Sequence, residues 1–139
     1  MKVITYLTFG GQCEEALNFY KNALGGEIKY LSHMGDSPME VPGNLKNKIM
    51  HARLQVGENE LYMSDTFDPS SLKQGNNVSL SIDISDPVKA EELYKKLSNG
   101  GTVIMPLEKT YWAEKFGMFK DKFGINWLMN CEKRVASSE

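Results

Sequence analysis

The chain has 139 residues, with 16 Lys or Arg, 18 Asp or Glu and a formal net charge of −2. Its 41% hydrophobic and 10% aromatic residues exclude a disordered tail, and its near-neutral charge argues against a nucleic-acid partner, which a basic face would bind. This length predicts one domain or two small fused modules. No apolar run reaches the ~18–20 residues that cross a bilayer, and no signal-peptide pattern opens the sequence, so we expect a cytoplasmic protein without a membrane partner.

The first half of the chain predicts one helix among four strands. Residues 2–9 (KVITYLTF) are rich in β-branched and aromatic types, which favour a strand. Apolar residues recur with helical spacing over 12–24, and Gly25-Gly26 ends this helix because glycine adopts the left-handed conformation at low cost. A polar loop is expected at 35–47. Three more strands are expected at 27–34, 48–56 and 60–64.

The second half repeats this order after a linker at 66–75. Residues 77–84 alternate like a strand. Asp86 is a suitable N-cap and Pro87 suits the first helical position, so a helix follows, and Gly100-Gly101 ends it. The last three strands are expected at 102–107, 115–120 and 125–131.

The sequence therefore predicts an α+β protein built as two βαβββ modules, about 1–65 and 76–132, within a single domain at 1–139. One helix covers only one face of each sheet, so the other face must be buried by something else. We expect the modules to pair around a central cleft, the kind of space in which small ligands bind. A ferredoxin-like βαβ core is the alternative, but it leaves the runs of three strands unexplained.

Three segments of the chain carry a family resemblance. They are TFGGQCEEALNFYKNALGGE (8–27), HARLQVGENELYMSD (51–65) and YWAEKFGMFKDKFGINWLMN (111–130). Together they resemble the vicinal oxygen chelate superfamily of glyoxalase and bleomycin-resistance proteins, and in particular its PhnB-like branch. The resemblance implies a glyoxalase-like fold and a homodimer, since relatives often complete the pocket with residues of a partner chain.

The same resemblance implies where a metal ion would be held. Metal-dependent members of the superfamily use His, Gln or Glu side chains from the first and last strands of the two modules. These positions correspond here to Thr5, Leu61, Ser79 and Leu128. Neutral hydroxyls are weak ligands and leucine is none, and the neighbouring choices offer no imidazole or carboxylate: Tyr6, Tyr62, Met63, Leu80, Trp127 and Met129. We therefore expect no bound metal, and no cofactor.

Two kinds of side chain are candidates for ligand contact. Strand alternation places His51 on one face with Arg53 and Gln55, where it could anchor a ligand or shuttle a proton, although such a row would equally suit solvent or an interface. Aromatic residues could stack on a ligand or simply fill the core. The candidate ligand-binding residues, including the two carried over from the metal positions, are Thr5, His51, Tyr62, Ser79, Trp112 and Trp127.

Neither the two cysteines nor any known catalytic motif identifies a catalytic residue in this sequence. Cys13 and Cys131 form no CxxC pair, and we expect two buried thiols. Cys13 opens a helix, where its pKa could fall and make it a nucleophile, but burial would leave it inert. No P-loop, dinucleotide fingerprint or nucleophile elbow occurs in the sequence.

We expect a homodimeric, metal-free, PhnB-like protein that binds a small, partly apolar ligand. One alternative is a lyase or isomerase with a divergent site, either using displaced metal ligands or using His51 without metal. Another is a structural dimer whose cavity is filled by its own side chains. The scaffold alone decides between none of these, because one fold hosts several functions.

Overall fold

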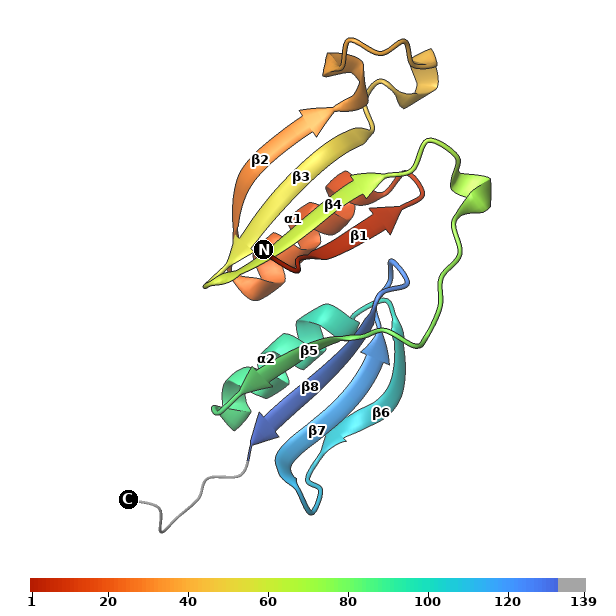
Figure 1. Cartoon of the computed structure of the whole chain (residues 1–139). Coiled ribbons are helices and arrows are strands. Elements are labelled where there is room, and N and C mark those ends of the chain that lie inside the picture. Colours follow the sequence, from red (N-terminus) through yellow and green to blue (C-terminus); the bar gives the residue numbers. More distant parts are fainter. Residues whose placement is uncertain (133–139) are drawn as a thin grey trace. The chain divides into compact units, whose positions relative to one another are not determined.

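The computed structural model describes residues 1–132 and divides into two compact units, of which the first is Met1–Lys73 and the second begins at Gln74. Each unit is a βαβββ module with one α-helix and one four-stranded sheet (Figure 1). The boundary falls inside the linker that the sequence predicts at 66–75. The two-module α+β architecture is confirmed, whereas the pairing of the modules around a cleft in a single domain stays a prediction.

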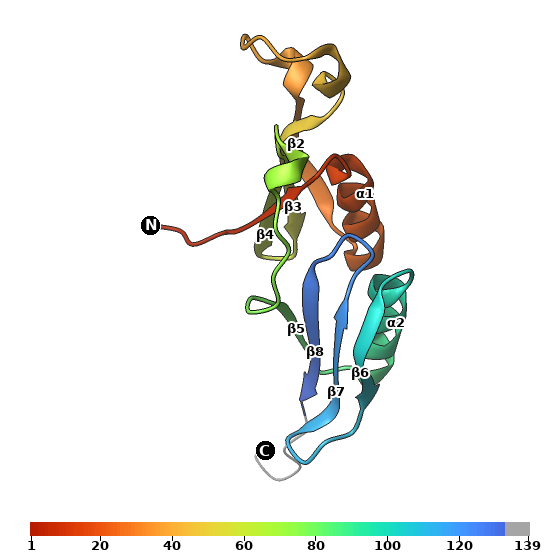
Figure 2. The same cartoon turned by 90° about the vertical axis from the view of Figure 1, so that its right-hand side faces the viewer.

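The first unit is built on a mixed sheet with the strand order β1-β4-β3-β2. β1 and β4 are parallel, and β3 is antiparallel to both of its neighbours. The helix α1 lies along one face of this sheet and leaves the other face open (Figure 2). The elements are β1 (Thr5–Phe9), α1 (Cys13–Leu24), β2 (Glu27–His33), the 3-10 turns η1 (Met34–Asp36) and η2 (Gly43–Leu45), β3 (Ile49–Val56), β4 (Asn59–Asp65) and the 3-10 turn η3 (Pro69–Ser71).

The core of the first unit lies between α1 and its sheet. Leu17 and Tyr20 of the helix are fully buried, as are Leu54 and Met63 of the sheet. Gly25 ends α1 with a φ of 74°, and its N–H donates to the Lys21 carbonyl, so this residue forms the left-handed cap that the sequence predicts.

Asp65 fastens the start of α1 to the sheet. Its Oδ1 accepts the N–H groups of Gly11 and Cys13, each at 2.9 Å, and its Oδ2 accepts the N–H of Ile49 at 2.9 Å. The N-cap residue Gln12 makes no side-chain cap of its own. The carboxylate lies at the positive end of the helix dipole and is 4% exposed. One buried side chain therefore ties the ends of α1, β3 and β4 together.

The second unit repeats this topology, with the strand order β5-β8-β7-β6 and β5 parallel to β8. α2 begins as predicted, because Asp86 accepts the N–H groups of Val88 (3.0 Å) and Lys89 (3.4 Å), and Pro87 is the first helical residue. Its C-cap is Asn99, one residue before the predicted glycine pair. The elements are β5 (Leu80–Ile84), α2 (Pro87–Ser98), β6 (Thr102–Glu108), β7 (Ala113–Lys120) and β8 (Asn126–Glu132).

Two predicted strands begin three residues later than expected. β1 starts at Thr5 instead of residue 2, because its parallel ladder with β4 runs only from Thr5 opposite Leu61 to Phe9 opposite Asp65. β5 starts at Leu80 instead of residue 77. Within residues 1–132, no helix has the length and apolarity that a membrane span requires.

The segment before β5 is held by a side chain rather than by a strand ladder. Asn126 donates from Nδ2 to the carbonyl oxygens of Gly75 (2.8 Å) and Val78 (3.1 Å). These two carbonyls therefore have a partner without belonging to the sheet. The alternation that predicts a strand over 77–84 cannot distinguish this arrangement from a ladder.

Candidate ligand-binding face

The sheet of the first unit has one face covered by α1 and one open face. Along β3, Ala52 and Leu54 are fully buried under the helix. His51 and Arg53 point the opposite way, and His51 is half-buried whereas Arg53 is exposed. Figure 1 views this sheet from its open side, with α1 behind it. The open face therefore carries the side chains that alternate with the core, as strand geometry requires.

Five side chains from all four strands meet on this face, and we name them the open-face cluster: Tyr6, Tyr30, His51, Arg53 and Tyr62. The His51 ring lies 5.8 Å from Tyr6, 5.8 Å from Tyr30 and 5.1 Å from Tyr62, between ring centres. The Arg53 guanidinium carbon lies 4.7 Å from the centre of the Tyr62 ring and 5.7 Å from that of Tyr30. Both distances are within the range of cation–π attraction. Tyr6 and Tyr30 are each 50% exposed, so the cluster is accessible from solvent within the unit.

A chain of hydrogen bonds fixes the protonation of His51. Arg53 donates from Nε to His51 Nε2 at 3.1 Å, so Nε2 must be the acceptor and the neutral ring carries its proton on Nδ1. That Nδ1–H donates to Tyr6 Oη at 3.3 Å, and Tyr6 donates to Ser64 Oγ at 3.0 Å. Burial and the positive charge of Arg53 both lower the pKa of His51. His51 is therefore neutral at pH 7, with both ring nitrogens engaged.

Arg53 keeps an uncompensated charge on the open face. In the described part of the chain no carboxylate pairs with it, and its two terminal amino groups make no hydrogen bond. Strand register places two carboxylates on this face, and each has another partner: Glu60 pairs with Lys2 at 3.6 Å, and Glu27 pairs with Lys29 at 3.3 Å. The Nη groups of Arg53 are therefore the free hydrogen-bond donors of the cluster.

The side chains of the open face do not fit a divalent metal ion. No group of three or more His, Cys, Asp or Glu residues is placed to hold a metal within residues 1–132. The lone pair that His51 could offer at Nε2 already accepts a hydrogen bond from Arg53, which also places a positive charge beside it. A metal ligand needs a free lone pair and gains from nearby negative charge.

The candidate residues carried over from the family do not join the cluster. Thr5 is half-buried and alternates with Tyr6, so it shares the helix-covered side with Leu7. Ser79 is exposed and lies just before β5. Of the predicted ligand-binding residues, the structure brings His51 and Tyr62 together and leaves these two hydroxyls elsewhere.

The two tryptophans lie in the second unit, in contrasting places. Trp112 precedes β7, is 48% exposed and packs edge-on against Phe116 with 5.3 Å between ring centres. Trp127 is 3% exposed, because its Nε1–H donates to the buried carboxylate of Asp121 at 2.9 Å and its ring stacks on Phe119. Trp127 therefore lies in the core of the second unit, and its contact with a ligand stays a prediction.

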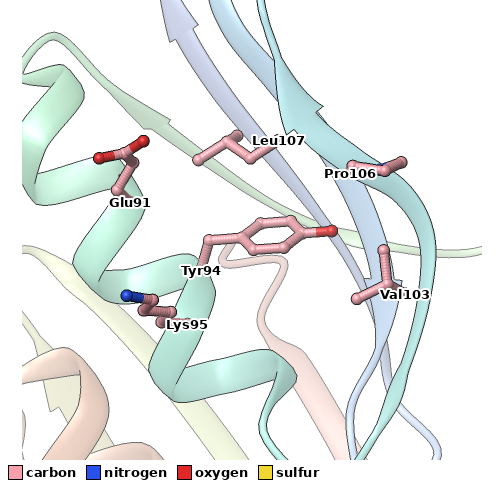
Figure 3. A pocket seen from close by; sticks show the side chains of 6 residues that line it. All are labelled: Glu91, Tyr94, Lys95, Val103, Pro106 and Leu107. Atoms are coloured by element: carbon pink, nitrogen blue, oxygen red, sulfur yellow. The ribbon is translucent and has the colours of Figure 1, made fainter.

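A pocket of about 290 Å³ opens between α2 and β6 in the second unit (Figure 3). Its size is at the lower limit for sites that enclose a small molecule, about 300 Å³. The Tyr94 hydroxyl already donates to the carbonyl of Met105 at 2.7 Å, and Glu91 pairs with Lys115. Most of its polar groups therefore have partners inside the protein, and it is a weaker candidate than the open-face cluster. The lining residues are Glu91, Tyr94, Lys95, Val103, Pro106 and Leu107.

The prediction of two buried thiols is confirmed for Cys13 and Cys131. Burial, together with the negative charges of Asp65 and Glu14, raises the pKa of Cys13 far above its usual range. The thiol therefore stays protonated, although it begins a helix. This environment does not suit a nucleophile.

Three members of the cluster are absent from the predicted set: Tyr6, Tyr30 and Arg53. The alternation that places His51 on one face also places Arg53 there, so the signal for Arg53 is present in the sequence. Tyr6 and Tyr30 join only through the strand order β1-β4-β3-β2, in which Tyr6 lies opposite Tyr62 and Tyr30 opposite Arg53. That pairing joins residues far apart in the chain, and alternation within one strand does not reveal it.

Comparisons with known proteins place this architecture in a family. A sequence model described as 3-demethylubiquinone-9 3-methyltransferase matches residues 1–130. The crystal structure of protein PA1353 from Pseudomonas aeruginosa is 41% identical, with 96% of this chain and 99% of that one covered and a TM-score of 0.86. A PhnB protein from Bacillus cereus is 26% identical, with 94% and 99% covered and a TM-score of 0.83.

A more distant structure extends the likeness in fold alone. The fosfomycin resistance protein FosX from Listeria monocytogenes is 11% identical, with 96% of this chain and 94% of that one covered and a TM-score of 0.68. The family match, the PhnB structure and this shared fold agree with the resemblance that the sequence carries. The chain therefore belongs to the PhnB-like, 3-demethylubiquinone-9 3-methyltransferase family, and it shares its fold with the fosfomycin resistance protein FosX.

Proposed function

We propose that this protein binds a small, partly apolar molecule on the open face of its first sheet, without a metal ion. The observation that supports this most is the open-face cluster, in which three tyrosine rings surround a neutral His51 and an uncompensated Arg53. Aromatic rings offer apolar area, and a few fixed polar groups orient a ligand upon it. The cluster combines both on one surface.

The hydrogen bonds of His51 favour binding over proton transfer. A general base needs a free lone pair within reach of the substrate, and His51 Nε2 already accepts from Arg53. To take a proton there, His51 would have to release a cationic donor. His51 is better suited to orient Arg53 and Tyr6, so the lyase or isomerase alternative has less support.

The other predicted ligand-binding residues and the predicted homodimer have less support than the open-face cluster. Trp112 is exposed enough to contribute a ring to a ligand, whereas Thr5 and Ser79 stand apart from the open-face cluster. A cytoplasmic homodimer is proposed from the family resemblance. Sedimentation equilibrium at micromolar concentration checks the dimer, and a single species of 15.7 kDa would refute it.

A thermal-shift screen tests the proposed function. The panel holds small carboxylic acids, amides and aromatic metabolites, and includes S-adenosylmethionine because of the family's description. A ligand at 100 times its Kd adds about 2.7 kcal/mol to the free energy of unfolding, enough to raise Tm by several degrees.

Two variants locate any shift that the screen finds. Tyr62→Ala removes a ring of the cluster and should abolish the shift. The control Phe67→Ala removes an exposed ring outside the strands and should retain it. A hit that is equally strong in Tyr62→Ala would place the ligand elsewhere and refute the proposed site.

A further inference from the structure

We propose that the ligand of the open-face cluster is a flat monocarboxylate, an aromatic or conjugated acid whose carboxylate is held by Arg53. This inference rests on the proposed function and names its ligand class. It is carried by the juxtaposition of one free guanidinium fork with tyrosine rings on either side.

The positive charge of Arg53 favours an anionic ligand on the open face. Arg53 has no carboxylate partner among residues 1–132, while the other charges of the face pair with each other, Lys2 with Glu60 at 3.6 Å and Lys29 with Glu27 at 3.3 Å. A ligand with one negative charge balances the remaining positive charge, whereas a phosphate dianion would exceed it. Arg53 therefore favours a monoanion.

The geometry of Arg53 calls for two parallel acceptors. Its Nε is held by His51 at 3.1 Å, which leaves the two terminal amino groups without partners. A guanidinium fork matches the two oxygens of a carboxylate, and such paired bonds are stronger and more directional than single ones. His51 acts as a positioning residue, since its neutral ring accepts from Nε and adds no charge that would compete.

The rings around Arg53 call for a flat apolar body. Tyr62 and Tyr30 lie within 5.7 Å of the guanidinium carbon, and Tyr6 and Tyr30 are half exposed. A planar group next to the bound carboxylate would meet these rings edge-on or in offset stacking, the arrangements that aromatic pairs prefer. A branched aliphatic acid would gain less from the same surface.

The test measures the Kd of three small probes by ligand-observed NMR with the full chain: benzoate, its neutral isostere benzamide, and acetate. Benzoate should bind about tenfold or more tightly than either of the others, because it alone presents both the charge and the ring. Arg53→Gln should weaken benzoate by about tenfold and change benzamide by less than about twofold. Tyr62→Ala should weaken benzoate and leave acetate unchanged.

A control variant and two comparisons between probes test whether benzoate is bound through its carboxylate. Lys21→Gln removes an exposed positive charge from α1, on the covered side of the sheet, and it should leave benzoate binding unchanged. Equal affinity for benzoate and benzamide, with both weakened by Tyr62→Ala, would refute the inference that the ligand is a carboxylate. The same result would still support binding of a small molecule on the open face. Phenyl phosphate binding more than about tenfold tighter than benzoate would also overturn it. If no probe and no panel member binds the face, both proposals fail.

Discussion

Asp65→Asn should destabilise the protein strongly, although the change replaces a single oxygen. The carboxylate accepts two N–H groups at Oδ1 and one at Oδ2, all at 2.9 Å. An asparagine has one carbonyl oxygen, so its NH₂ group must face at least one of these donors. One bond to a charged acceptor is worth about 1.5–3 kcal/mol, and a buried N–H without a partner costs about 1–3 kcal/mol. The lost bond and the N–H left without a partner describe partly the same change, so the two values are not simply added. We expect the free energy of unfolding to decrease by about 2–4 kcal/mol.

Urea denaturation followed by far-UV circular dichroism measures this loss. Tryptophan fluorescence is less suitable, since Trp112 and Trp127 both lie in the second unit, whereas Asp65 lies in the first. The control Asp83→Asn removes the same charge from an exposed side chain at the end of β5, and should change the free energy of unfolding by less than about 0.5 kcal/mol. A loss below about 1 kcal/mol for Asp65→Asn would refute the view that this carboxylate ties α1 to the sheet.

Three further predictions concern other parts of the chain. Because the pKa of His51 is lowered in the folded protein, the unfolded chain binds more protons below about pH 6.5, so the free energy of unfolding should decrease as the pH is lowered through this range. In urea denaturation at several pH values, this decrease should be smaller for His51→Gln. Arg53→Gln should raise the pKa of His51 in an NMR titration, and an unchanged pKa would contradict the contact between Arg53 and His51. Gly101→Ala should cost at least about 2 kcal/mol in urea denaturation, because its Cβ would lie 2.1 Å from the Lys120 carbonyl oxygen, and a neutral result would refute this close approach. A thiol reagent should modify Cys13 only when the protein unfolds, and rapid labelling of the native protein would contradict its burial.

Local signals account for the parts of the fold that the sequence predicts well. Asp86 and Pro87 define the start of α2 through contacts within three residues, and Gly25 defines the end of α1 through its own φ. The starts of β1 and β5 are less predictable, because they depend on where a distant strand offers a ladder partner. Asp65 shows the same limit, since its place after the strand predicted at 60–64 does not reveal that it accepts three distant N–H groups.

The candidate site follows the same division between local and distant information. Alternation along one strand is enough to put His51 and Arg53 on one face, and Tyr62 follows from the next strand. Tyr30 and Tyr6 join them only through register with β3 and β4. The side of β8 on which Trp127 lies is hard to predict for a related reason: an aromatic side chain suits either face, and the sequence does not show that its Nε1–H donates to Asp121.

Amide chemical-shift mapping of the wild-type protein during a titration with benzoate tests directly whether the open face binds the ligand. If the open face of the first sheet is the binding site, the largest shifts should lie in β2, β3 and β4, near Tyr30, Arg53 and Tyr62, and should saturate together. Shifts confined to the pocket between α2 and β6, or to the surroundings of Trp112, would show that the ligand binds in the second unit and not on the open face.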